Sequence, residues 1–511
     1  MLRAAGFYAA EVEGSIEGDA PPFDVTVTVT PGPLYELSAY EIAYRGEGNE
    51  ELPRDPAALG LAIGGPARSA PIAAAETALL ERLAELGRPR AAVLDRRYLV
   101  DHEARSLTGR LEVDPGPELA FGPLAIAGLD RVEESYIRRL VPWEEGGRYD
   151  SRQVAVLEER LRDSGLFDSF AVEAGAPDAE NRLPQTLRLA EAKRRSIGAG
   201  GGYASDEGPF GEAFWEHRNF FGEGERLTVT LGASALEQSL TAEGRKPNFL
   251  RLDQALVAES ALTRADNEAF EEESLRIFGG LERRLSETWS VTAGPSFEYA
   301  RLTDATGQNE FALVGFPMLA RRDSSDDLLS PTEGSRLDLS LTPYNDALEQ
   351  TLFFTVAEAA GSTYYALDEG RRVIAAARAR IGSLVGADTA EVPANKRFYA
   401  GGGGSVRGYE FQSLGPLDAS EDPLGGRSVL ELGFELRLRV AEDFGVVPFV
   451  EGGQVYDDPL PTFDEELRWA AGLGLRYFTA VGPLRFDVAF PLNGRERDDL
   501  FEFYISLGQA F

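Results

Sequence analysis

The sequence predicts small α+β domains of the order β-α-α-β-β, followed by an all-β, 16-stranded transmembrane β-barrel. Three observations predict this fold class. A sequence pattern recurs about every 80 residues in the first third of the chain. The helical period of apolar residues disappears after about residue 194. From there to residue 511, short segments alternate between apolar and polar or charged residues.

Three glycines mark the repeat, and each follows a leucine by four residues. They are Gly6, Gly87 and Gly165, and an apolar, strand-like segment begins shortly after each. The strings VTPGP (29–33) and VDPGP (113–117) recur at nearly the same distance. Two interlocked sets of matches indicate repeated domains. The predicted domains are a partial one at 1–33, complete ones at 34–117 and 118–193, and the barrel at 194–511.

The second of these domains illustrates the predicted order. Alternation over 37–46 predicts a strand, 69–87 has the pattern of a helix, and 90–116 that of an antiparallel hairpin. Ser69 is the predicted N-cap of the helix and Gly87 its C′ residue. The first domain begins at its second helix and lacks the apolar core of a signal peptide. We therefore expect the N-terminus to be truncated in this sequence.

The composition excludes several classes of function. Lys and Arg number 51 and Asp and Glu number 85, and the net charge of −34 argues against a nucleic-acid partner. The absence of cysteine excludes thiol nucleophiles and cysteine metal sites. Of the two histidines, only His217 falls in the barrel region, and no GxSxG motif accompanies it. We predict no enzymatic activity, no metal and no cofactor.

The barrel is predicted from alternation with charge on one face. In 336–343 and 435–440, leucine and valine occupy one face, while arginine, acidic residues and serine occupy the other. A soluble sandwich would also alternate. However, the charged face suits a wet lumen, and 194–511 is long for one soluble sheet. At about 20 residues per strand with its connection, this length gives about 16 strands, an even number as in bacterial barrels.

The most distinctive string is FYAGGGGSVRGYEFQSLGP, at 398–416. Neither phosphate-binding pattern fits it: GxGxxG has no register, and Tyr409 stands where GxxxxGK[ST] requires lysine. A flexible linker would explain the glycines but not the VRGY that follows them.

This block resembles the sixth-loop motif (V/I)RG(Y/F) of the BamA/TamA-like outer-membrane assembly superfamily, with Val406, Arg407, Gly408 and Tyr409 as its residues. Three further segments resemble motifs of that superfamily in the same order. The first is its D-x-x-x-P-x-x-G strand motif, with Asp326, Asp327, Pro331 and Gly334; the others are FVEGGQVYDD (449–458) and VGPLRFDVAFPLN (481–493). The repeats resemble its POTRA (polypeptide-transport-associated) domains. The small number of POTRA domains and the sequence GPLRFDVAFPLN are most similar to those of the TamA members of this superfamily.

The resemblance implies that the sixth loop folds back into the lumen and that Arg407 pairs with acidic residues of the inner wall. A guanidinium removed from water requires carboxylates in bidentate geometry. The candidate partners are Glu435, Glu451 and Asp487. Alternation places Glu435 and Asp487 on the charged face, whereas two glycines after Glu451 leave its face open. Arg407 has either a purely structural role or a role in gating.

The resemblance also implies a lateral seam between the first and last strands as the working edge. The first strand, 195–205, carries Gly198, Gly200, Gly201 and Gly202, and the last strand ends at Phe511. Glycine weakens a strand. Such a seam can open sideways and template an incoming strand through backbone hydrogen bonds.

The implied localisation is the outer membrane, with the POTRA domains in the periplasm. The implied function is that of a translocation and assembly factor, which inserts or secretes autotransporters and other β-barrel proteins without covalent chemistry. The implied partners are a TamB-like periplasmic protein, unfolded outer-membrane proteins, and outer-membrane lipids with lipopolysaccharide. The alternatives are a two-partner secretion pore, a BamA-type core factor and, from another class, a passive porin.

Overall fold

The computed structural model describes residues 1–17, 24–205, 208–348, 352–479 and 482–507. The chain divides into two compact units, Met1–Ala192 and Lys193–Phe511. Within the described residues, no helix is both long and apolar enough to cross a membrane.

The first unit contains a β-hairpin followed by a three-stranded sheet. The hairpin follows the 3-10 helix η1 (Arg3–Ala5) and consists of β1 (Glu11–Glu17) and β2 (Asp24–Thr30). The sheet has the order β3-β5-β4, with β3 (Glu36–Tyr44) parallel to β5 (Ser106–Asp114) and β4 (Ala92–Asp101) antiparallel to it. Helix α1 (Ser69–Glu85) buries Ile72, Ala75, Leu79 and Leu83 in the core of this domain.

A second three-stranded sheet repeats the pattern. Its elements are β6 (Ala120–Ala127), α2 (Glu134–Leu140), α3 (Ser151–Ser164), β7 (Phe167–Ala174) and β8 (Arg182–Glu191), and the strand order is β6-β8-β7. The core contains Leu157 and Leu161 of α3, and the ring of Phe121 stacks on Trp143. This domain has the predicted order β-α-α-β-β.

In the preceding domain, a single 3-10 turn, η2 (Ala57–Leu59), takes the place of the first helix. Pro53, Pro56 and Gly60 surround it, and proline and glycine both disfavour a longer helix there. Helix α1 begins at Ser69, whose Oγ donates to the carbonyl of Ala4 at 3.1 Å. The prediction that Ser69 is the N-cap is therefore wrong, because its hydroxyl serves a long-range contact instead.

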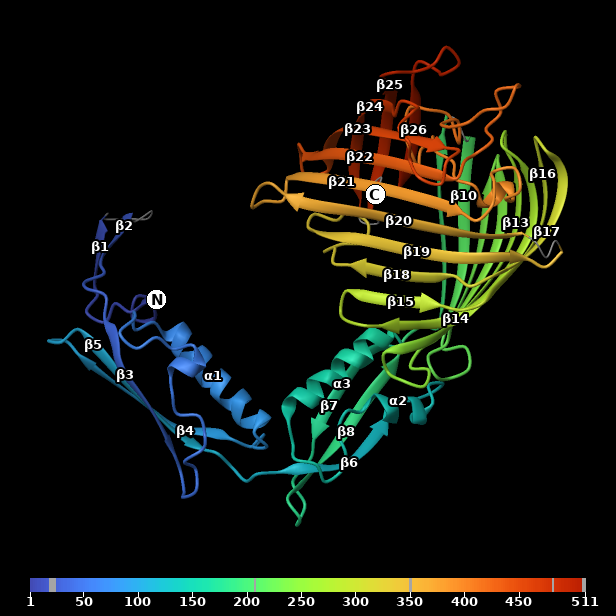
Figure 1. The fold of residues 1–511 in the computed structure, drawn as a ribbon. Helices are drawn as coiled ribbons and strands as arrows, with labels where there is room; N and C mark the ends of the chain where they lie inside the picture. The colour runs from blue at the N-terminus through green and yellow to red at the C-terminus, as the bar shows by residue number, and fades with distance from the viewer. Residues whose placement is uncertain (18–23, 206–207, 349–351, 480–481, 508–511) are drawn as a thin grey trace. The chain divides into compact units, whose positions relative to one another are not determined.

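The second unit is a closed antiparallel barrel (Figure 1). Its described strand segments are β9 (Arg195–Ala204), β10 (Gly208–Arg218), β11 (Arg226–Ser234), β12 (Glu237–Lys246), β13 (Gln254–Asp266), β14 (Glu271–Arg284), β15 (Trp289–Ala293), β16 (Ser296–Asp304), β17 (Gly307–Gly315), β18 (Met318–Asp323), β19 (Gly334–Asp346), β20 (Phe353–Ala366), β21 (Val373–Val385), β22 (Ser428–Arg439), β23 (Phe444–Tyr456), β24 (Arg468–Thr479), β25 (Gly482–Pro491) and β26 (Glu502–Leu507). Successive strands pair around the ring, with β15 and β16 forming one strand and β17 and β18 another, and β26 pairs with β9.

Two strands of the ring are broken into halves. Segments β15 and β16 both pair with β14, while β17 and β18 both pair with β19. Pro295 and Pro317 lie at the two breaks, where proline cannot donate a ladder hydrogen bond. At Gly294, a Cβ would lie 2.1 Å from the carbonyl oxygen of Gly279, so only glycine fits. In the described residues, 18 segments minus two breaks give 16 strands, which confirms the prediction.

Alternation divides the barrel wall into two faces. On β25, Leu484, Phe486 and Phe490 are exposed, whereas Arg485 and Asp487 are buried inside. We call the end at which β9 begins, directly after β8, the proximal end, and the opposite end the loop end. The sixth connection at the loop end, between β21 and β22, spans 386–427 and includes the 3-10 helix η3 (Ala394–Lys396).

Candidate functional site

The sixth loop buries its VRGY motif against the inner wall of the barrel. Val406, Arg407 and Tyr409 are each at most 1% exposed. Gly408 has a φ of +98°, and a Cβ there would lie 3.0 Å from the Cβ of Ala470. Glycine is therefore required both by the left-handed backbone and by the close approach to β24.

Arg407 contacts carboxylates from three strands. Its Nε and Nη2 donate to the two oxygens of Glu451 on β23, at 3.0 and 2.7 Å, and its backbone N–H donates to Glu451 Oε2 at 2.9 Å. Nη2 also donates to Glu435 Oε1 on β22 at 2.9 Å, and Nη1 to Asp487 Oδ2 on β25 at 2.6 Å. We call Arg407 with these three carboxylates the arginine lock.

The guanidinium of the lock is also held from one face. Its Cζ lies 3.5 Å from the centroid of the Phe449 ring, within cation–π range. All three carboxylate side chains are fully buried. Paired and hydrogen-bonded charges of this kind tolerate burial, but each depends on the presence of its partners.

Four further arginines surround the same carboxylates. Arg378 contacts Glu451 at 3.2 Å, Arg437 contacts Glu435 at 3.0 Å, and Arg485 contacts Asp487 at 2.9 Å. Arg476 forms an ion pair with Asp487 as well. Sequence reasoning did not assign these arginines to the site, although alternation had already set Arg437 beside Glu435 and Arg485 beside Asp487 on one face.

The neighbours of Arg407 in the motif anchor the loop by packing. Val406 belongs to an apolar cluster with Leu414, Val429 and Val455. The hydroxyl of Tyr409 donates to the carbonyl of Trp469 at 3.0 Å. The tip of the loop is therefore fixed by apolar contacts as well as by charge.

The motif also reaches the last strand. The backbone N–H of Gly408 donates to the hydroxyl of Tyr504 on β26 at 3.0 Å. A Cβ on Gly403 would lie 2.8 Å from the ring of the same tyrosine. The arginine lock and the strand that closes the barrel thus share a contact.

The predicted seam lies between β26 and β9. Within the described residues, their register pairs Tyr504 with Ala204 and Ile505 with Tyr203. Ser205 adds one backbone bond, from its N–H to the carbonyl of Phe503 at 3.0 Å. Phe511, which was predicted to belong to this seam, lies outside the described residues.

The four predicted seam glycines lie on β9, opposite β10. Gly198 pairs with Phe214 and Gly202 with Phe210, and Cβ atoms on these glycines would collide with the two aromatic rings at 2.3 and 2.5 Å. A Cβ on Gly202 would also lie 2.4 Å from the carbonyl oxygen of Ile505, across the seam. Gly200 and Gly201 lie between them, opposite Glu212 and Gly211.

The predicted strand motif forms the connection 324–333 at the proximal end, outside the arginine lock. Asp326 accepts from the hydroxyl and N–H of Thr332, and Asp327 accepts from the N–H groups of Leu329 and Ser330. Burial raises the pKa of Asp326, but the hydrogen bonds that Asp326 accepts outweigh the effect of burial and lower its pKa to about 2.

Two further residues of this motif act through the backbone. Gly334 has a φ of +95°, and a Cβ there would lie 2.1 Å from the carbonyl oxygen of Ser324. The carbonyl of Pro331 lies 3.4 Å from Arg437 Nη1, which links the connection to the inner wall. Among the residues that the structure describes, no group of three or more His, Asp or Glu has the arrangement of a metal site.

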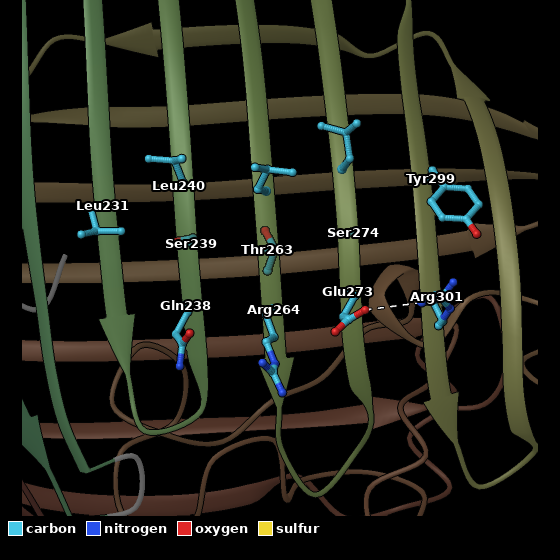
Figure 2. A pocket seen from close by; sticks show the side chains of 12 residues that line it. Leu231, Gln238, Ser239, Leu240, Thr263, Arg264, Glu273, Ser274, Tyr299 and Arg301 are labelled. Carbon is cyan, nitrogen blue, oxygen red and sulfur yellow. Dashed lines mark ion pairs between the residues drawn. The ribbon is translucent and has the colours of Figure 1, made fainter.

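A shallow groove runs over β11, β12, β13, β14 and β16 near the loop end (Figure 2). Leu231, Leu240 and Leu262 line it and are about half exposed. Figure 2 shows Arg264, Glu273 and Arg301 nearer to the connecting turns, and Glu273 pairs with Arg301 at 3.5 Å. The groove thus has an apolar part and a charged margin.

The chain is similar to known outer-membrane proteins. The Omp85 superfamily domain matches residues 219–511. The chain is 23% identical over 489 residues to the outer membrane protein assembly factor BamA of Neisseria meningitidis, covering 81% of this chain and 59% of the relative. It is 24% identical to BamA of Nitratidesulfovibrio vulgaris, covering 76% of this chain and 50% of the relative. The chain therefore spans less than two thirds of the length of these relatives.

Solved structures have the same fold. The crystal structure of Haemophilus ducreyi BamA lacking POTRA domains 1–3 matches with a TM-score of 0.79 at 19% identity, covering 93% of this chain and all of that one. CdiB from Acinetobacter baumannii matches with a TM-score of 0.52 at 13% identity, covering 93% and 90%. A particular likeness to TamA members remains a prediction. Because the superfamily domain covers more than half of its length, the chain belongs to the Omp85 superfamily, and its barrel is an outer-membrane β-barrel.

Proposed function

We propose that this chain is an outer-membrane translocation and assembly factor, which inserts or secretes autotransporters and other β-barrel proteins through its lateral seam without covalent chemistry. The short register between β26 and β9 carries this proposal. Among the described residues it joins two pairs, whereas the register between β24 and β25 runs without a break from Ala470 to Thr479. A weakly paired edge offers backbone donors and acceptors to an incoming strand.

The arginine lock supports a role in controlling this seam. Gly408, next to Arg407, donates to Tyr504, and Tyr504 is itself a seam residue. A change at the lock is therefore transmitted to the seam strand through one hydrogen bond. In this proposal Arg407 takes part in gating in addition to anchoring the loop.

The proposed substrates are unfolded outer-membrane proteins. The proposed POTRA domains are 1–33, 34–117 and 118–193, whose strand edges would hold unfolded chains or a TamB-like periplasmic partner by strand addition. The groove of Figure 2 suits outer-membrane lipids, because its leucines fit acyl chains and Arg264 fits a phosphate of lipopolysaccharide.

A reversible disulfide across the seam tests this function. The chain contains no cysteine, so Tyr203→Cys with Ile505→Cys introduces the only thiols, at paired positions. The oxidised double variant is expected to lose assembly of a β-barrel substrate, and a reductant is expected to restore it. Assembly is measured as the protease-resistant, folded substrate formed in vesicles that contain the purified protein.

The matched control is Tyr477→Cys with Leu484→Cys, a paired position between β24 and β25 with similar exposure and outside the groove of Figure 2. Oxidation of this control is expected to leave assembly unchanged. Full assembly through an oxidised seam would contradict the proposal and favour a secretion pore or a porin, which pass substrates through the lumen.

A further inference from the structure

Five arginines line a small cavity in the lumen at the proximal end. Arg371 and Arg372 come from the turn between β20 and β21, Arg437 and Arg439 from the end of β22, and Arg476 from β24. Ser330 and Thr332 of the connection 324–333 add hydroxyl groups, and the remaining lining is apolar or glycine. None of the described lining residues is acidic, although acidic residues outnumber basic ones by 85 to 51 in the chain.

Two of these arginines are buried and held in place. Arg437 is 5% exposed; its Nε donates to Glu435 at 3.0 Å, and its Nη1 contacts the carbonyl of Pro331 at 3.4 Å. Arg476 is fully buried and forms an ion pair with Asp487. Because their side chains are already ordered, a ligand would not have to immobilise them.

The other arginines form the mouth of the cavity. Arg439 is exposed, donates to the backbone carbonyl of Glu442 at 2.6 Å and lies over the ring of Phe478 at 4.5 Å. Arg371 pairs with Asp326 and Glu333, at 3.1 and 2.9 Å. Arg372 is exposed at the end of the same turn.

The inner wall around the arginine lock carries an excess of positive charge. Among the described residues, six guanidinium groups and five carboxylates form one network of ion pairs there, a difference of 6 − 5 = 1; they are Arg378, Arg380, Arg407, Arg437, Arg476 and Arg485 with Glu358, Glu431, Glu435, Glu451 and Asp487. Excess charge away from bulk water is unfavourable unless an opposite charge offsets it.

We propose that this cavity binds a phosphate group, either as inorganic phosphate or as the phosphate of a small ligand. The planar donor fork of arginine matches the oxygens of phosphate, and several arginines suit a dianion. The cavity has a volume of about 60 Å³, which limits the ligand to one such group. Its exposed arginines, Arg371, Arg372 and Arg439, belong to a turn and a strand end at the proximal end of the barrel.

Phosphate binding would strengthen the arginine lock. Glu435 uses Oε1 for Arg407 and Oε2 for Arg437, and Asp487 uses Oδ2 for Arg407 and Oδ1 for Arg476. A dianion in the cavity attracts Arg437 and Arg476 and offsets part of their charge. Both carboxylates then interact more fully with Arg407.

Calorimetric titration of inorganic phosphate into the full chain, folded in detergent micelles, tests the site. The variant Arg372→Gln with Arg439→Gln removes two charges at the mouth and leaves the arginine lock intact. We expect its phosphate affinity to fall about tenfold or more, since each charge-assisted hydrogen bond contributes measurably. Chloride at equal ionic strength corrects for screening.

The matched control is Arg251→Gln, an exposed arginine in the connection between β12 and β13 at the same end, outside the cavity. Phosphate is expected to raise the temperature at which the folded gel band disappears in the wild type and this control, but not in the double variant. Equal phosphate binding by the double variant would overturn the site. Tighter binding of acetate than of phosphate would overturn the phosphate assignment.

A parallel titration with lysophosphatidic acid identifies the source of the group. Tighter binding of this lipid than of inorganic phosphate would assign the site to a lipid headgroup. Equal or weaker binding would assign it to a free phosphate. Either result supports the cavity as a phosphate site, provided that the double variant loses it.

Discussion

Arg407 gives the clearest expectation for a single residue. Arg407→Ala leaves three buried carboxylates without their shared cation, and removing one partner of a buried pair costs about 3–5 kcal/mol. We expect the free energy of unfolding in lipid vesicles, measured by urea titration, to fall by about this amount. Arg407→Lys should recover only part of it, because an ammonium cannot reproduce the fork that contacts Glu451.

Arg321→Ala serves as the comparison for this experiment. Arg321 pairs with Asp338 at 2.6 Å, but both side chains are largely exposed. Exposed pairs contribute about 0–1 kcal/mol. A loss at Arg407 no larger than the loss at Arg321 would contradict the burial argument.

The partners of Arg407 could be nominated from sequence because strand periodicity is short and regular. The resemblance implied acidic partners on the inner wall, and alternation placed Glu435 and Asp487 on the charged face. The face of Glu451 could not be decided, since the two following glycines leave open a bulge in the strand. In the structure the register is unbroken there, and the ring of Trp469 covers Gly452, where a Cβ would lie 2.6 Å away. That cover comes from a neighbouring strand, which local pattern does not specify.

At the scale of an element, a side-chain N-cap stabilises the first turn of helix α3. Asp150 is the N-cap, and its side chain accepts from the N–H of Arg152 at 2.9 Å. Asp150→Ala removes this bond and should destabilise the helix by about 1 kcal/mol. Hydrogen exchange of the α3 amides in the full chain measures the effect as faster exchange. Glu159→Ala on the same helix should leave exchange nearly unchanged, and equal acceleration in both variants would contradict the capping role.

The strands themselves were largely predictable, whereas their interruptions were not. Alternation is a property of a few consecutive residues, so segments such as 336–343 were recognisable. The breaks at Pro295 and Pro317 depend on which neighbour each half-strand pairs with. The cations around the arginine lock were missed for a similar reason. They share a face with the predicted acids, but their mutual distances depend on the register between strands.

For the whole molecule, closure of the barrel predicts heat-modifiable migration on a gel. A closed ring of hydrogen-bonded strands stays compact in detergent until it is heated. The chain refolded into lipid vesicles should therefore migrate faster unboiled than boiled. The chain kept in urea is the control and should show a single, slow band under both conditions. Identical migration of the vesicle sample before and after boiling would contradict a closed barrel.

The two broken strands have a consequence for how such a ring deforms. Counted from β9, they are the seventh and eighth of the 16 strands, so they lie halfway round from the junction of β26 with β9. A ring that parts at one point must flex most at the point opposite. At that point Pro295 and Pro317 interrupt the two strands, and Gly294 allows its backbone to approach the backbone of Gly279 closely. We therefore expect the barrel to bend at its seventh and eighth strands when β26 and β9 separate.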